Sequence, residues 1–203
     1  MRRLRLFFAV WPPREVQNRL WRSLASLRES AAGVRWVPPE RLHITLRFMG
    51  DTSPDELPRL VAAADTLRSI APFEAELAGA GTFPRRGPPR VYWVGARSAA
   101  LPALREDLDR ALTGNGIERE ERIFSPHLTV GRTRGARPAG DRLPTGRTFG
   151  DCLPDGLGFT VATIHLVRSD LFPGGSRYAN IHEIVLGRRK RRNRAWAGHS
   201  RDS

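Results

Sequence analysis

The chain has 203 residues, an apolar content of 40% and a formal net charge of +13. This length can bury a sizeable core. A single cysteine, Cys152, excludes an internal disulfide framework and a cysteine-rich metal site. No apolar run reaches the length of a membrane span, and the apolar stretch near the start is too short for a secretory signal. We therefore expect a cytoplasmic protein with no membrane partner.

The positive charge is weak evidence for a nucleic-acid ligand. Of the 34 basic residues 33 are arginine, a skew that indicates the base composition of the gene more than a function. Arg188–Ser203 alone holds seven basic residues and one acid, with no apolar periodicity. We expect residues 1–187 to form one domain and 188–203 to be a basic, disordered tail.

The first half of the chain alternates predicted strands and helices. Strand patterns cover residues 4–11, 34–37 and 41–50, and apolar residues at helical spacing predict helices over 12–31 and 53–70. Ser53, Pro54 and Glu56 form a capping-box pattern at the start of the second helix.

The second half begins with predicted strands at 73–79 and 91–96, joined by a loop at 81–90 that is rich in Pro, Gly and Arg. A helix over 101–112, a strand at 125–132, a mobile loop at 133–150 and strands at 159–167 and 178–186 complete the order. No glycine-rich phosphate loop follows a strand. The order predicts an α+β protein with antiparallel sheets.

Two segments contain the same four-residue pattern, His-apolar-Thr-apolar. They are His43-Ile-Thr-Leu and His127-Leu-Thr-Val, 84 positions apart. Side chains alternate faces along a strand, so His43 and Thr45 share one face and Ile44 points to a core. The same reasoning applies to His127 and Thr129. The repetition predicts two similar lobes, each lending one imidazole and one hydroxyl to a shared cleft.

Two imidazoles that face each other can serve as acid and base in one displacement at phosphorus. One ring takes a proton from the attacking water, and the other gives a proton to the departing oxygen on the opposite side. The hydroxyls of Thr45 and Thr129 would donate to the non-bridging oxygens. A strained 2′,3′-cyclic phosphate suits this chemistry and demands no metal or other cofactor.

Other interpretations of these residues stay open. A lone histidine on a strand is usually a half-exposed surface residue, and threonine is an ordinary strand former. Zinc binding would need a further ligand near the motifs, and only His165 and His182 are candidates to supply one. We treat His165 as structural because it lies on the polar face of its strand. Trp36 and Phe48 flank the first motif and are candidates either for stacking on a base or for the core.

Five segments together resemble a known family. In chain order they are LRLFFAVWPP, VRWVPPERLHITLRFMGD, GAGTFPRRGPPRVYWVGA, FSPHLTVGRTR and LVRSDLFPGGSRY. They are similar, over residues 4–186, to the bacterial and archaeal RNA 2′,3′-cyclic phosphodiesterases. These proteins are also named 2′-5′ RNA ligases and belong to the 2H phosphoesterase superfamily.

The resemblance implies a bilobal α+β fold, in which two antiparallel sheets form a central cleft and the helices lie outside. It implies metal-free hydrolysis of RNA 2′,3′-cyclic phosphate ends to 2′-phosphates, with reversible 2′-5′ ligation in some members. By the family's assignment His43 is the proton donor and His127 the acceptor, and Thr45 and Thr129 match the motif threonines. Arg132 is a candidate phosphate contact, or a surface arginine. The expected partner is RNA with a cyclic phosphate end, such as a tRNA fragment, bound by a monomer.

Two other functions stay open at this point. The chain could be an RNA-binding module with a vestigial site, held on RNA by its arginine-rich surface. It could also be a relative within the superfamily that acts on a small cyclic nucleotide or a 2′-5′ oligonucleotide.

Overall fold

The structure is a computed structural model that describes residues 3–135, 143–172 and 175–188. Almost all of the predicted tail, from residue 189 on, lies outside the described residues. The described strands are β1 (Leu4–Val10), β2 (Val34–Trp36), β3 (Ile44–Thr52), β4 (Phe73–Phe83), β5 (Val91–Arg97), β6 (His127–Thr133), β7 (Gly158–Val161), β8 (Thr163–Phe172) and β9 (Gly175–Val185). The helices are α1 (Arg14–Ser23), α2 (Ala25–Ser30), α3 (Leu57–Asp65), α4 (Ala100–Thr113) and α5 (Gly146–Gly150), with short 3₁₀ turns η1 (Pro39–Arg41), η2 (Pro54–Glu56) and η3 (Thr66–Ser69).

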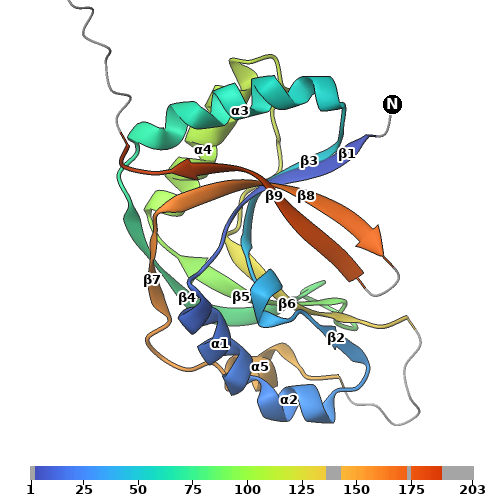
Figure 1. Cartoon of the computed structure of the whole chain (residues 1–203). Coiled ribbons are helices and arrows are strands. Elements are labelled where there is room, and N and C mark those ends of the chain that lie inside the picture. Colours follow the sequence, from blue (N-terminus) through green and yellow to red (C-terminus); the bar gives the residue numbers. More distant parts are fainter. Residues whose placement is uncertain (1–2, 136–142, 173–174, 189–203) are drawn as a thin grey trace, which may run out of the picture.

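Within the described residues, all nine strands belong to one antiparallel sheet. Its order is β7-β4-β5-β6-β3-β1-β8-β9, with β2 paired to β6. The α+β class is confirmed, but the prediction of two separate sheets is wrong. A single residue pair, Ile44 with Leu128, joins β3 to β6 and makes the two halves continuous. Figure 1 shows α3 and α4 at one end of this curled sheet and α1, α2 and α5 at the other.

Several predicted elements differ from the observed ones at their ends. The helix predicted over 12–31 is two helices that meet at Leu24. The strand predicted at 159–167 is interrupted at Ala162, because β7 pairs with β4 whereas β8 pairs with β1 and β9. The loop predicted at 81–90 begins later, since β4 continues to Phe83. The loop predicted at 133–150 contains α5, and its residues 136–142 lie outside the described residues.

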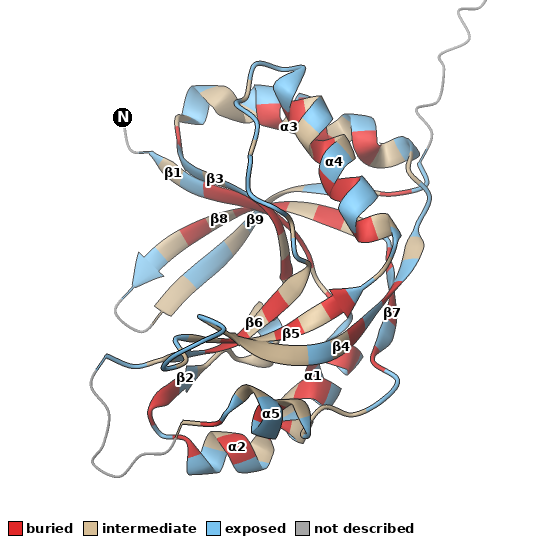
Figure 2. Ribbon diagram, turned by 180° about the vertical axis from the view of Figure 1, so that it is seen from behind, coloured by how far each residue is buried: buried red, intermediate tan, exposed pale blue. Residues whose placement is uncertain are grey.

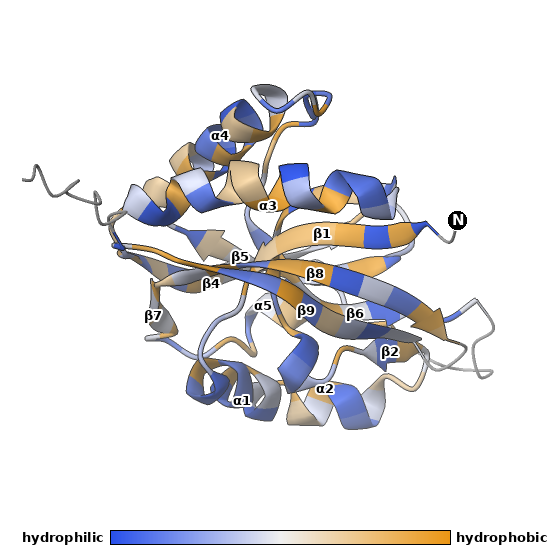
Figure 3. Ribbon diagram, turned by 45° about the horizontal axis from the view of Figure 1, so that its top comes forward, coloured by the Kyte–Doolittle hydropathy of each residue, from blue (hydrophilic) through white to orange (hydrophobic). Residues whose placement is uncertain are grey.

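Alternating side chains divide β1 between two surfaces. Leu6, Phe8 and Val10 join the large core that the helices cover. Phe7 and Ala9 point the other way and pack with Val167 of β8 in a smaller cluster. Buried residues alternate with more exposed ones along β5 and β7 (Figure 2). The apolar residues Ile164, Leu166 and Val167 lie in the first half of β8, whereas residues 168–170, toward the β8–β9 hairpin, are polar (Figure 3).

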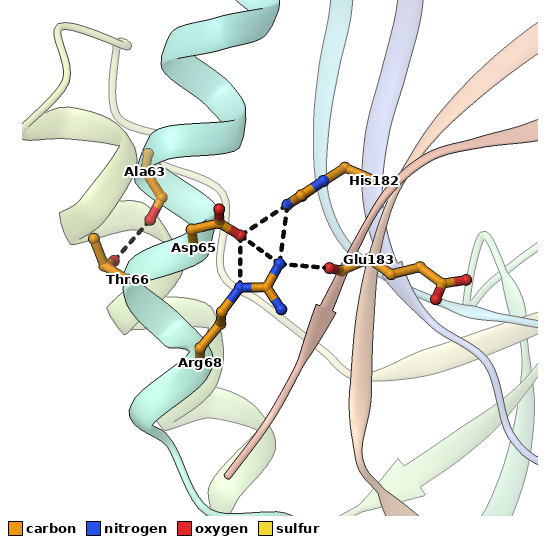
Figure 4. Close-up of polar contacts among 6 residues, drawn as sticks. All are labelled: Ala63, Asp65, Thr66, Arg68, His182 and Glu183. Carbon is orange, nitrogen blue, oxygen red and sulfur yellow. Dashed lines mark hydrogen bonds and ion pairs between the residues drawn. The ribbon is translucent and has the colours of Figure 1, made fainter. Parts of the chain in front are cut away.

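Polar contacts fix the α3 end of the molecule to the sheet. The capping box predicted at Ser53 and Glu56 is present in η2. At the end of α3, the carboxylate of Asp65 accepts a hydrogen bond from Nε2 of His182 on β9 at 2.7 Å and one from Nε of Arg68 at 2.9 Å (Figure 4). Burial acts to raise the pKa of Asp65, but these hydrogen bonds outweigh it and lower that pKa. Arg68 also donates to the carbonyl of Glu183, which ties this turn to β9 a second time.

Candidate active site

A cavity of about 430 Å³ opens on the face of the sheet opposite the large core. Both predicted motifs line it, through His43 and Thr45 from the start of β3 and His127 and Thr129 from β6. The middle residues of the two motifs, Ile44 and Leu128, are fully buried on the other face. The structure thus brings together two His-Thr pairs that lie 84 positions apart in the sequence.

The two histidines share one hydrogen-bonding arrangement. Nδ1 of His43 lies 2.7 Å from the carbonyl oxygen of Arg41, and Nδ1 of His127 lies 2.7 Å from the carbonyl oxygen of Ser125. A carbonyl oxygen only accepts, so Nδ1 carries the hydrogen and donates in both rings. In the neutral ring this leaves the lone pair on Nε2. Each imidazole is therefore oriented so that Nε2 can exchange a proton with a ligand.

Aromatic rings surround His43. Its ring stacks on Trp11 with centroids 4.9 Å apart, and it contacts Phe7 at 5.0 Å and the edge of Tyr178 at 5.3 Å. Burial lowers the pKa of His43 to about 4, and a positive charge on His127 adds to this effect. The hydrogen bond to the Arg41 carbonyl acts in the opposite direction but does not compensate. His43 is consequently neutral near pH 7 in the free protein.

The surroundings of His127 are more open. Phe83 and Trp93 approach its ring at 5.6 and 6.2 Å, both in edge orientations. Trp93 lies directly over Gly81 on the neighbouring strand, where a Cβ atom would overlap the indole ring. A residue without a side chain is required at position 81 for Trp93 to keep this place beside His127.

The two threonines and Arg132 also line the cavity. Thr45 and Thr129 are half-buried. Within the described part of the chain, neither hydroxyl donates to another protein group, so both are available to a ligand. Arg132 is exposed on β6 and lines the cavity with its side chain.

A buried ionic cluster forms one end of the cavity. The guanidinium of Arg47 on β3 pairs with Asp109 on α4 and donates to the carbonyl of Glu118, and Arg105 pairs with the other oxygen of Asp109. Strict alternation would have placed Arg47 on the same face as His43 and Thr45. A bulge at Leu46 shifts the register, because Ala9 pairs with Thr45 whereas Phe8 pairs with Arg47. Sequence reasoning missed this cluster, since a bulge leaves no clear mark in an alternating pattern.

The aromatic candidates separate into two kinds. Phe48 lines the cavity and is 57% exposed, whereas Trp36 packs against Tyr92 at the large core. Tyr178 and Trp11, which the sequence did not single out, stand beside His43 instead. The sequence could have pointed to both residues, because each belongs to one of the five segments that carried the family resemblance.

The remaining histidines do not join the two motifs. His182 pairs with Asp65 at α3, and His165 lies beside Trp11 in a second cavity next to the first. Among the residues described here, no cluster of three or more His, Cys, Asp or Glu could hold a metal ion. None of the described helices has the length and apolar character to cross a membrane.

Comparison with known proteins shows which family this chain belongs to. Residues 10–93 match the family described as LigT-like phosphoesterases. A protein of Methanothermobacter thermautotrophicus named RNA 2′,3′-cyclic phosphodiesterase is 35% identical over 189 residues, which cover 91% of this chain and all of the relative. A crystal structure from Thermus thermophilus superposes with a TM-score of 0.76 at 33% identity, over 90% of this chain and 98% of that one. Escherichia coli LigT in complex with 3′-AMP matches with a TM-score of 0.70 at 27% identity, over 92% and 99% of the two chains.

Because the likeness to these relatives spans nearly the whole chain, the protein belongs to the LigT-like phosphoesterase family.

Proposed function

We propose that this protein hydrolyses the 2′,3′-cyclic phosphate at the end of an RNA to a 2′-phosphate, with His43 and His127 as its acid–base pair. The observation that carries the proposal is the matched orientation of the two rings. Each donates from Nδ1 to the carbonyl two residues before it, and both line one cavity. The names of the relatives supply the substrate class.

The proposed reaction requires the two Nε2 atoms to lie on opposite sides of one phosphorus. His127 takes a proton from a water molecule as the water oxygen bonds to phosphorus. The bond from phosphorus to O3′ breaks, and O3′ receives the proton of His43. The product carries a 2′-phosphate and a 3′-hydroxyl, and the two rings return to their starting states through solvent. An in-line displacement needs its acid and base on opposite sides of the phosphorus. His43 and His127 come from two neighbouring strands and line the same cavity, which supports this role.

Neutral donors and cations support the charge that develops on the phosphate. Thr45 and Thr129 are positioned to donate to the two non-bridging oxygens, one from each motif. Arg132 adds a positive charge at the same cavity. Arg47 and Arg105 are two further cations at the end near α4, where Asp109 pairs with both of them and Glu120 also lines the cavity.

The lowered pKa of His43 bears on which ring is the acid. A neutral His43 accepts a proton and has none to give from Nε2. For His43 to be the donor, as the family assignment has it, the bound phosphate must raise its pKa. An anion between the rings has this effect, because an opposite charge within a few ångströms favours the protonated imidazole. We assign the donor role to His43 in the substrate complex and not in the free protein.

Product analysis tests the proposal directly. An RNA oligonucleotide with a 2′,3′-cyclic phosphate end is incubated with the protein and a metal chelator, and the phosphate position in the product is determined. We expect a 2′-phosphate and no 3′-phosphate. His43→Ala and His127→Ala should each abolish turnover while the far-ultraviolet circular dichroism and the thermal midpoint stay near those of the parent protein.

The alternatives predict different results. A binding module with a vestigial site would bind RNA in a salt-dependent way but leave the cyclic end intact. A 3′-phosphate product would mean that the other P–O bond breaks, which contradicts the assignment of the leaving oxygen. Ligation of RNA halves is tested by adding an RNA with a free 5′-hydroxyl and looking for a longer product.

A further inference from the structure

A second cavity, of about 560 Å³, adjoins the catalytic one on the side of His43. It lies over the β8–β9 face of the sheet. Two residues, Arg41 and Tyr178, line both cavities. Nothing in the proposed reaction uses the second cavity, because neither motif contributes a side chain to it.

We propose that this second cavity binds the nucleotide that precedes the cyclic end, so that the protein recognises at least two nucleotides of a single-stranded RNA. This inference rests on the proposed function and deepens it. Three features of the second cavity support it: an aromatic stacking surface, a cation where the two cavities meet, and hydrogen-bonding groups in the lining.

The stacking surface is formed by Trp11 and Tyr178. Their rings meet edge to face with centroids 6.5 Å apart, and Tyr178 is 36% exposed. Aromatic faces of this kind bind bases with little sequence preference, since every base has a π-face. A volume of about 560 Å³ is within the range of pockets that hold a nucleoside-sized ligand.

The cation at the junction is Arg41. Its side chain reaches both cavities, and among the described residues its guanidinium has neither an ion pair nor a hydrogen bond. A dinucleotide with its cyclic end between the two histidines must pass its internal phosphodiester from one cavity to the next. Arg41 stands at that passage and can pair with the phosphate oxygens there. Arg177, stacked on Phe172 at 4.6 Å, adds a second positive charge at the far side of the second cavity.

The floor supplies groups that can bond to a base edge or a ribose. Asn180 and His165 both line the cavity, and Glu40 adds an acceptor at its rim. Burial lowers the pKa of His165, with Glu183 acting in the opposite direction, so this ring is neutral at physiological pH and can both donate and accept. The cavity therefore combines the features of a nucleotide site and has no other assigned ligand.

The test compares one nucleotide with two. Adenosine 2′,3′-cyclic phosphate and the dinucleotide ApA with a 2′,3′-cyclic end are assayed with the parent protein and with the double variant Arg177→Gln/Asn180→Ala. We expect the parent to have a lower KM for the dinucleotide. The double variant should raise that KM about tenfold, with kcat retained and the KM for the mononucleotide unchanged. The matched control is Arg168→Gln, which removes one positive charge from the same hairpin at a residue that lines neither cavity.

A binding measurement separates this inference from the proposed reaction. Calorimetry with adenosine 2′-phosphate and with ApA 2′-phosphate needs no turnover. Tighter binding of the dinucleotide, weakened by the double variant and not by the control, supports the second site even if the chain proves inactive. Equal binding of the two ligands overturns the inference. An equal loss of affinity for both ligands in the double variant also overturns it, because the second cavity would then hold the terminal base. A loss of affinity in Arg168→Gln as large as in the double variant overturns it too, because it would indicate nonspecific attraction.

Discussion

Ile44 and Leu128 are the middle residues of the two His-x-Thr segments, and they form the pair that joins β3 to β6. Both are fully buried in the large core. In an antiparallel pair a local two-fold axis passes between the two opposed residues. His43 and Thr45 are therefore related to His127 and Thr129 by an approximate two-fold rotation about this pair. The relative placement of the two imidazoles follows from this one backbone pairing, and each ring is oriented by the carbonyl two residues before it.

Leu128→Ala should reduce both stability and turnover. Truncation of a fully buried leucine costs about 2–5 kcal/mol of unfolding free energy, and here the cavity it leaves lies directly behind both histidines. We expect kcat to fall because small displacements of catalytic groups are costly. The control is Leu112→Ala on α4, which is equally buried but lies outside both motifs. Chemical denaturation and kcat are measured for both, and a similar loss of kcat in Leu112→Ala would contradict the special role of the pair.

The pKa of His43 should be visible in the pH dependence of stability. In the unfolded chain histidine titrates near 6.5, whereas burial holds His43 near 4 in the folded protein. As pH falls from 6.5 toward 4, the unfolded state takes up a proton that the folded state refuses, so the free energy of unfolding decreases. The full effect is on the order of 3 kcal/mol. His43→Gln should flatten this part of the profile. An unchanged slope in the variant would show that another group causes the loss.

Phosphate should raise the pKa of His43. The ring signals of His43 are followed by nuclear magnetic resonance during a pH titration, without and with saturating inorganic phosphate. We expect the midpoint to move from about 4 toward neutrality when the anion is bound. A midpoint that stays near 4 would assign the role of base to His43 and that of acid to His127.

The threonine hydroxyls should act on turnover and not on folding. Thr45→Val and Thr129→Val each remove one donor to the non-bridging oxygens and keep the shape of the side chain. We expect kcat to fall by about 10²-fold or more in each, with little change in the unfolding free energy. Thr163→Val on β8 is the control, because it makes the same change on a strand residue that lines neither cavity. Parent-like kcat in both motif variants would remove the threonines from the mechanism.

The ionic cluster at Asp109 should be far more important to stability than a similar pair on the surface. Asp109→Ala leaves the guanidiniums of Arg47 and Arg105, both 5% exposed, without their shared anion and should cost about 3–5 kcal/mol. Asp107→Ala breaks the exposed pair with Arg110 on the same helix and should cost at most about 1 kcal/mol. The two unfolding free energies are compared directly. Equal costs would mean that water reaches the Asp109 cluster as freely as the surface pair.

The sequence by itself determined the local features of this protein. Alternation along a strand is a property of the backbone, so the motif residues could be divided into Ile44 and Leu128 toward the core and His43 and His127 toward a cleft. The capping box at Ser53 and Glu56 could be predicted for the same reason, since it depends on neighbours a few residues apart.

Only the tertiary structure decided the relationships between distant segments. The joining of two predicted sheets through one pair, the bulge that turns Arg47 toward α4, and the enclosure of His43 by Trp11 and Tyr178 all depend on which strands meet and in which register. Register between distant strands is set by the packing of the whole core and not by any local pattern. For this reason the sequence could name the two histidines, whereas their different burial and the low pKa of His43 required the fold.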